Sequence, residues 1–252
     1  MEGMLFCCPK CQREEEIVLD RKPRCMKCGV EMVPPSDYSS VSMSPYTAIV
    51  RMNTISERCG FERARTDGRF KREREAWAAG WLALALSKLK DDIWWVEVET
   101  VDATPDTRLL QIEETADGNV VNIRNIENVD WEENVDDVMT VIQKKCKRRY
   151  PHDYLLLVHA RNRLKAINFD CVIEEMKSVQ SPFLEVWMIA VIGVDDIKVV
   201  RISPGLPFVD LKIRAEMKNA SKQIQFIKRG SRGRESGFYD AGKMFLPLPR
   251  CD

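Results

Sequence analysis

Two pairs of cysteines near the start of the chain have the spacing of a metal site. Each pair has two residues between its thiols, and the ligands predicted from this spacing are Cys8, Cys11, Cys25 and Cys28. Two such turns can complete a tetrahedron of thiolates around Zn²⁺. Cys7 is the alternative to Cys8, although Cys8 gives the symmetric spacing. Four thiolates leave no open coordination position, so we expect this zinc to be structural and not catalytic.

Residues 1–35 are therefore predicted to form a zinc ribbon whose folding energy comes from the metal, because the segment is too short to build a core. A redox role is the alternative, but neither pair stands at the strand-to-helix junction of a thioredoxin-like pattern. The other cysteines show no pairing pattern, which favours reduced thiols. Such a ribbon can bind nucleic acid or protein, and its lysines and arginines suit phosphate contacts or a solvated face equally well.

The composition is that of a globular protein. Of 252 residues, 44% are hydrophobic and 31% are charged, and no apolar run approaches the ~20 residues that span a bilayer. We expect no membrane contact. The first residues lack the features of a secretory signal, so a cytoplasmic location is expected. A Ser-His-Asp order, a phosphate-binding glycine loop and a dinucleotide fingerprint are also lacking, which makes the common hydrolases and dehydrogenases poor candidates.

Charge is segregated along the chain although its sum is zero. Lys and Arg outnumber Asp and Glu by 16 to 12 in residues 1–90 and by 21 to 12 in residues 141–252, whereas residues 91–140 contain 2 against 15. The acidic middle could dock a basic protein partner, or its carboxylates could cap helices. A basic run near the end of a predicted helix suits phosphate contacts, with a solvated helix terminus as the alternative: Lys144, Lys145, Lys147, Arg148 and Arg149.

The order of predicted elements indicates an α/β (α+β) fold, with a mixed central sheet flanked by helices. Helices are expected at residues 69–90, 134–149 and 167–179, and strands at 92–100, 107–114, 119–127, 153–160, 183–193 and 197–204. The Asp117-Gly118 turn makes the second and third strands a hairpin. In the first helix the tryptophans are expected to belong to an apolar stripe, and Gly80 allows another element to approach closely. His159 is expected to be a hydrogen-bonded strand-end residue and His152 an exposed loop residue.

This order resembles the restriction-endonuclease-like PD-(D/E)xK superfamily, whose core is a helix, a three-stranded meander, a helix and a strand. The resemblance covers residues 55–205 and includes Pro105-Asp106 just before the second strand. We therefore expect a zinc ribbon over 1–35, a linker over 36–54, the restriction-endonuclease-like domain over 55–205 and a partly flexible extension over 206–252.

The resemblance also implies a metal site. Asp106 matches the family aspartate, and Glu73 or Glu75 could supply the carboxylate that often comes from the first helix. On the third strand the expected acidic-x-Lys signature is Asn122-Ile123-Arg124, which departs from the pattern; Gln111-Ile112-Glu113 is the alternative ligand strand, and Glu97 and Glu99 could add carboxylates. The resulting catalytic candidates are Asp106, Glu113 and Glu73.

Two functions follow from these patterns. The first is a nucleic-acid-associated protein with a nuclease-like domain, either a phosphodiesterase that uses Mg²⁺ or Mn²⁺ or, as the incomplete motif favours, a relative with a degenerate site. The second is a non-enzymatic zinc-ribbon adaptor that binds other proteins of a larger assembly.

Overall fold

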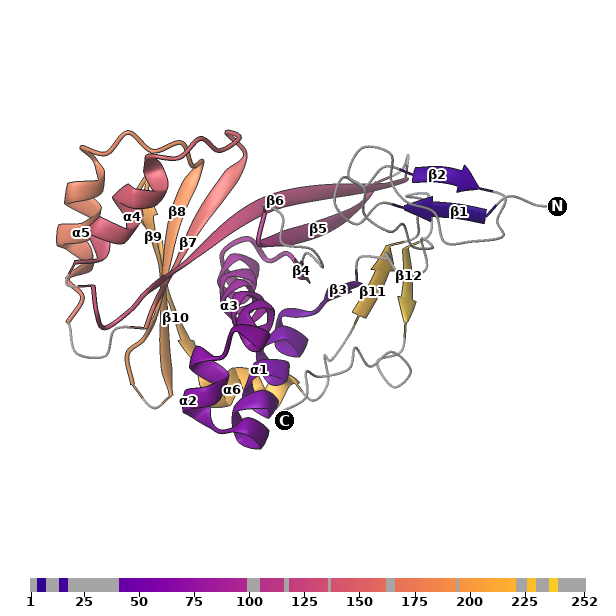
Figure 1. The fold of residues 1–252 in the computed structure, drawn as a ribbon, viewed down its shortest axis with the longest axis horizontal. Coiled ribbons are helices and arrows are strands. Elements are labelled where there is room, and N and C mark those ends of the chain that lie inside the picture. The colour runs from indigo at the N-terminus through magenta and orange to yellow at the C-terminus, as the bar shows by residue number, and fades with distance from the viewer. Residues whose placement is uncertain are drawn as a thin grey trace.

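Between residues 69 and 204, strands and helices follow one another in the order that the sequence predicts, and further elements precede and follow them (Figure 1). The computed structural model describes residues 41–98, 105–115, 118–135, 137–161, 166–193 and 195–220, and the strands 4–7, 14–17, 226–229 and 236–239. The strands are β1 (Met4–Cys7), β2 (Glu14–Ile17), β3 (Val41–Met43), β4 (Trp94–Val98), β5 (Thr107–Thr115), β6 (Gly118–Trp131), β7 (Tyr154–Ala160), β8 (Glu185–Val191), β9 (Asp196–Ser203), β10 (Phe208–Lys212), β11 (Phe226–Arg229) and β12 (Ser236–Tyr239). The helices are α1 (Pro45–Cys59), α2 (Phe61–Thr66), the 3₁₀ turn η2 (Gly68–Phe70), α3 (Lys71–Lys90), α4 (Val138–Cys146), α5 (Phe169–Met176) and α6 (Ile213–Ala220).

A mixed sheet in the strand order β10-β9-β8-β7-β6-β5-β4-β3-β11-β12 forms the centre of the fold. β4, β5 and β6 are an antiparallel meander, β6, β7 and β8 run parallel, and β9 and β10 return antiparallel. Helix α4 makes the crossover between the parallel strands β6 and β7, as such a connection requires. The predicted mixed sheet with an antiparallel hairpin is therefore confirmed.

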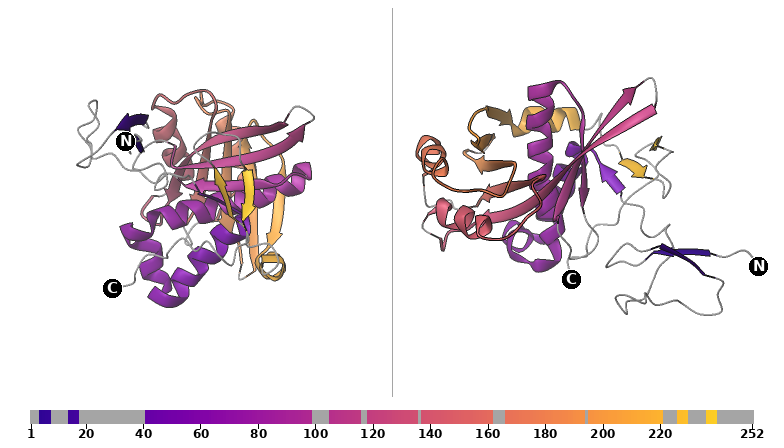
Figure 2. Two further views of the ribbon diagram at one scale, coloured as in Figure 1. Left: turned by 90° about the vertical axis from the view of Figure 1, so that its right-hand side faces the viewer. Right: turned by 90° about the horizontal axis from the view of Figure 1, so that it is seen from above.

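Helices cover both faces of this sheet (Figure 2). Side chains of β7 alternate between two hydrophobic clusters: Leu155 and Leu157 contact the cluster around α3, and Leu156 and Val158 contact the cluster that includes α4 and α5. This alternation explains why the strand is a continuous apolar run in the sequence, because both of its faces are buried.

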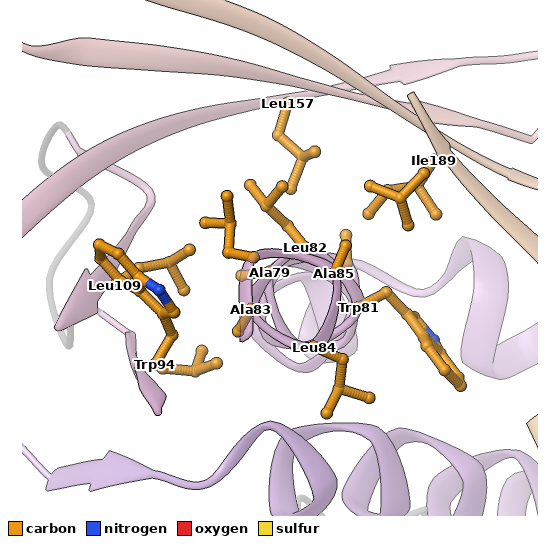
Figure 3. Packing of buried hydrophobic residues seen from close by; sticks show 14 of the residues in the cluster. Ala79, Trp81, Leu82, Ala83, Leu84, Ala85, Trp94, Leu109, Leu157 and Ile189 are labelled. Carbon is orange, nitrogen blue, oxygen red and sulfur yellow. The ribbon is translucent and has the colours of Figure 1, made fainter. Parts of the chain in front are cut away.

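Helix α3 is enclosed on all sides and does not show the predicted one-sided stripe. Every residue from Ala78 to Leu86 is buried. Figure 3 shows Leu82 directed toward Leu157 and Ile189 of the sheet, while Leu84 points the opposite way. The opposite side is covered by α1, which packs along α3. A helix buried all round has no polar face, and this is why the stripe prediction was wrong.

Helix α1 occupies most of the segment that the sequence predicts to be a linker. Ser44 caps its N-terminus by accepting a hydrogen bond from the Thr47 backbone N–H at 3.2 Å, and Pro45 occupies the first helical position. β3 precedes it and pairs with β4. The expected linker over 36–54 is thus wrong from residue 41 onward, because Ser and Pro here form a helix start and not a flexible connection.

The ends of the central domain also differ from the expected boundaries. β10 and α6 follow residue 205 and belong to the same fold, and β11 and β12 continue the sheet beyond β3. β1 and β2 form an antiparallel hairpin, but the predicted zinc ligands Cys8, Cys11, Cys25 and Cys28 lie outside the described residues.

Cys59 is disulfide-bonded, so the expectation of reduced thiols is wrong for this residue. Within the described part of the chain, no helix is long and apolar enough to cross a membrane.

The close approach of α1 to α3 depends on Gly80, as predicted. A Cβ atom added at Gly80 lies 3.0 Å from the Pro45 carbonyl oxygen and 3.2 Å from Ile49 Cγ1. We expect Gly80→Val to lower the free energy of unfolding by about 2 kcal/mol, because a backbone atom of α1 must move. Urea unfolding of Gly68→Val is the control: a Cβ at Gly68 meets nothing within 4 Å, and the change should stay within about 0.5 kcal/mol. Equal losses in the two variants would contradict this prediction.

Candidate functional site

The pairing between β5 and β6 ends near the middle of β6, and Asp106 lies at this break. β6 is 14 residues long; it pairs with β5 only as far as Ile126 opposite Thr107, and it pairs with β7 from Asn125 to Trp131. Asp106 immediately precedes β5. Its backbone N–H donates to the Ile126 carbonyl at 3.1 Å, and its Oδ2 accepts from the Asn128 backbone N–H at 2.8 Å. The Asp106 carboxylate therefore occupies the edge of β6 where β5 ends.

Glu127 on β6 is a buried carboxylate beside this break. Its side chain is 6% exposed. Oε1 accepts hydrogen bonds from Lys145 Nζ of α4 and from the Tyr150 hydroxyl, the latter at 3.0 Å. Oε2 is also buried, and no described residue donates a hydrogen bond to it. One oxygen of Glu127 is thus held by two donors, while the other is available to a further cation or donor.

Glu75 brings a third carboxylate from the other face of the sheet. Lys71, one turn earlier on α3, forms an ion pair with Glu75 Oε1 at 3.3 Å. Burial and then the negative charge of Asp106 raise the pKa of Glu75 to about 7. Burial also raises the pKa of Asp106; the hydrogen bond from Asn128 opposes this, the charge of Glu127 adds to it, and Lys71 and Lys145 oppose it. Asp106 is therefore electrostatically coupled to both faces of the sheet.

The raised pKa of Glu75 predicts a pH-dependent stability. The native state holds this proton more tightly than the unfolded chain, so the free energy of unfolding should fall as the pH rises from about 4.5 to about 7 and then level off. We expect a fall on the order of 2 kcal/mol. Urea unfolding at several pH values should show this slope in the wild type and in Glu73→Gln, but a smaller slope in Glu75→Gln. The same slope in Glu75→Gln would show that another group causes it.

Two of the carboxylates selected from the sequence do not join Asp106. Glu73 forms an ion pair with Arg51 of α1 at 3.4 Å, on the side of α3 that meets that helix. Glu113 lies opposite Val120, seven residues along β5 from Asp106, which is about 23 Å in an extended strand. An odd separation also puts the two positions on opposite faces of the sheet. Glu75, the alternative to Glu73, is the helical carboxylate that approaches Asp106.

The other residues considered as ligands have structural partners. Glu97 is buried between the Ser42 hydroxyl at 3.3 Å and Arg108 Nη1 at 3.1 Å. Arg124 forms an ion pair with Glu185 at 3.4 Å and lies over the Trp94 ring at 5.4 Å. Neither signature strand proposed from the sequence therefore supplies the partner of Asp106. Glu99 lies outside the described residues.

The sequence carries a signal for Glu127 in the register of the hairpin and not in the family motif. The two-residue loop after Thr115 pairs Thr115 with Gly118, and this fixes every later pair of the hairpin. Continued past Thr107 and Ile126, the same register puts Asp106 opposite Glu127. The position two residues further along the same face, where the family motif has lysine, is Val129.

The basic run at the end of α4 contains one residue that is directed inward and four that are exposed. Lys145 binds Glu127, whereas Lys144, Lys147, Arg148 and Arg149 are exposed.

The predictions for the histidines are confirmed. His152 is exposed, and His159 Nδ1 lies 3.3 Å from Asp130 Oδ1 with its ring 5.0 Å from the Trp77 ring. Burial alone would raise the pKa of Asp130, but the hydrogen bond and charge of His159, together with Arg161, lower it to about 2.

The described residues contain no group of three or more acidic, histidine or cysteine side chains close enough to enclose a metal ion unaided. The arrangement around Asp106 offers pairs of carboxylates with two lysines nearby. Comparisons of the chain with protein-family models, with curated proteins and with solved structures gave no match.

Proposed function

We propose that the central domain is a restriction-endonuclease-like domain that binds a divalent cation and hydrolyses phosphodiester bonds of nucleic acid. The observation that carries the proposal is geometric: Asp106 accepts a hydrogen bond from the Asn128 backbone N–H at the break between β5 and β6, and beside it lies the buried Glu127, whose Oε2 receives no hydrogen bond from a described residue. The proposed site consists of Glu75, Asp106, Glu127 and Lys145. The sheet order and the crossover helix α4 agree with the core of the family that the sequence resembles.

The donor set suits Mg²⁺ or Mn²⁺. Both ions prefer carboxylate oxygens, and Mg²⁺ is commonly held by one or two carboxylates together with water and substrate phosphate. Glu127 Oε2 is a buried acceptor to which no described residue donates, and such an oxygen is unfavourable without a cation or donor. When bound, the ion would polarise the phosphate and lower the pKa of a water molecule.

Lys145 supports the proposal because it supplies the cation that β6 lacks. Val129 stands where the motif has lysine, but Lys145 reaches Glu127 from α4. A lysine beside the scissile phosphate stabilises developing negative charge as a point charge. The four exposed cations of the basic run stand on both sides of Lys145 in the sequence and could bind the phosphates next to the scissile one.

The experiment is a cleavage assay with the full-length protein on single- and double-stranded DNA and RNA in MgCl₂ or MnCl₂, with EDTA as the blank. We expect metal-dependent cleavage that Glu127→Gln abolishes and that Glu113→Gln leaves unchanged. Calorimetric titration with MnCl₂ should show binding to the wild type and to Glu113→Gln and weaker binding to Glu127→Gln. An absence of cleavage on all four substrates, together with unaltered Mn²⁺ binding in Glu127→Gln, would contradict the proposal.

A second candidate is a protein whose nuclease-like site is degenerate and which acts as a zinc-ribbon adaptor. Two observations favour it: no three carboxylates of the described residues stand close enough to enclose an ion, and Val129 replaces the strand lysine. It predicts no cleavage, one zinc per chain that Cys25→Ser removes, and protein partners bound through the ribbon or the acidic region 91–140. Zinc content by mass spectrometry and partner capture by the wild type against Cys25→Ser would identify this case.

A further inference from the structure

Between residues 61 and 72, from α2 to the first residues of α3, the fold exposes cations and leaves few carboxylates at the surface. The exposed charged residues of this stretch are four cations and one carboxylate: Arg63, Arg69, Lys71, Arg72 and Glu62. The other two charged residues, Arg65 and Asp67, are partly buried. We call Arg63, Arg69, Lys71 and Arg72 the α2–α3 basic surface.

The carboxylate within this stretch that the surface contacts does not cancel its charge. Asp67 Oδ2 lies 2.8 Å from Arg69 Nη2 and 3.6 Å from Arg63 Nε, so two arginines share one negative charge. Arg72 forms no ion pair within the described part of the chain. The α2–α3 basic surface therefore keeps a net positive charge, and such a surface attracts a polyanion.

The α2–α3 basic surface adjoins the proposed site through Lys71. Lys71 Nζ lies 3.3 Å from Glu75 Oε1. Burial raises the pKa of Asp106, and the positive charge of Lys71 opposes this rise. Helix α3 packs on one face of the sheet, whereas α4, which ends in the basic run, packs on the other (Figure 2). Asp106 therefore stands between two basic surfaces, one on each face of the sheet.

We propose that the α2–α3 basic surface binds one phosphate backbone of a double-stranded nucleic acid while the basic run of α4 binds the other. A duplex suits this arrangement because its two backbones carry phosphates on both sides of a scissile bond, with one negative charge per ~1.7 Å of helix axis. Arginine suits such contacts because its planar guanidinium donates two hydrogen bonds to one phosphate. The position of the scissile phosphate at Asp106 rests on the proposed function, but the charge of the surface does not.

The composition of this surface favours nucleic acid over a protein partner. Between residues 61 and 72 the exposed large hydrophobic side chain is Phe61, and the other exposed side chains are polar or charged. The centre of a protein interface is depleted of charged residues, whereas phosphate contacts require them. The surface ends at Arg65, which lies 3.3 Å from Glu62 and 3.5 Å from Glu133. These carboxylates repel phosphate, so we expect the backbone to follow the start of α3.

The test is the salt dependence of duplex binding by the full-length protein, measured by fluorescence anisotropy with labelled DNA and RNA duplexes and no added Mg²⁺ or Mn²⁺. We expect Arg69→Gln/Arg72→Gln to reduce the slope of log association constant against log salt concentration by about two, because two phosphate contacts are lost. Arg63→Gln/Arg72→Gln, which keeps Arg69, should give the same decrease. The control, Lys177→Gln/Lys212→Gln, removes two exposed lysines at the end of α5 and on β10 and should change the slope by less than about 0.5.

Three results overturn the proposal: an equal decrease in the control, no binding of either duplex by the wild type, or tighter binding of a single strand of the same length. Thermal unfolding followed by circular dichroism verifies that each variant is folded. The cleavage assay separates this inference from the proposed function. A reduced slope in a protein that cleaves nothing would contradict the proposed function alone, whereas cleavage with an unchanged slope would contradict the role of the α2–α3 basic surface alone.

Discussion

Replacing Asp106 by Asn is expected to reduce metal-dependent cleavage by about 1000-fold, equivalent to about 4 kcal/mol of activation free energy, because the replacement removes the central charge of the proposed cation site. The same change should raise the stability of the metal-free protein at pH 8 by about 1 kcal/mol. The negative charge of Asp106 opposes ionisation of Glu75, and the Asn side-chain oxygen can still accept from the Asn128 backbone N–H. Lost activity with increased stability distinguishes a functional carboxylate from a structural one.

Cleavage rates and urea unfolding, both at pH 8, test this prediction. Glu113→Gln is the matched control, since Glu113 lies on the same strand but about 23 Å away. It should change neither quantity. A loss of stability in Asp106→Asn as large as 2 kcal/mol would indicate that Asp106 serves mainly to hold the edge of β6, and the proposed role would then be wrong.

Replacing Lys145 by Met is expected to lower the free energy of unfolding by about 3 kcal/mol, because Glu127 would keep a buried charge without its cation. Lys144→Met is the control, since Lys144 is the adjacent, exposed lysine and its replacement should cost less than about 0.5 kcal/mol. The double variant Lys145→Met/Glu127→Gln should recover to within about 1 kcal/mol of the wild type, because Tyr150 can still donate to the amide oxygen.

Denaturant unfolding of the wild type, Lys145→Met, Glu127→Gln and the double variant gives the coupling energy of the pair directly. The same unfolding experiments in MnCl₂ test whether Glu127 binds the metal ion. If Glu127 is a ligand, the ion should raise the unfolding midpoint of Lys145→Met more than that of the double variant. Additive losses in the double variant would mean that the Lys145–Glu127 contact contributes little.

Local patterns predicted most of the sheet and the crossover helix. The alternating strands around Asp117-Gly118, the apolar run of β7 and the basic end of α4 depend on neighbours in sequence, and all three are confirmed. α1 was missed because Ser44-Pro45 closes a stretch rich in Ser and Pro. That dipeptide is a helix start only if the next turns have a surface to cover, and α3 provides the surface.

The sequence by itself determined that Asp106 stands before a strand, and that a lysine-rich helix end follows the meander. Only the tertiary structure decided which groups Asp106 meets. Glu75 comes from the helix on one face, while Glu127 and Lys145 belong to the other face. Asp106 meets groups from both faces because it lies where β5 ends and β6 continues. Local propensity does not encode such a break; it results from the register of two strands and from the position at which one of them ends.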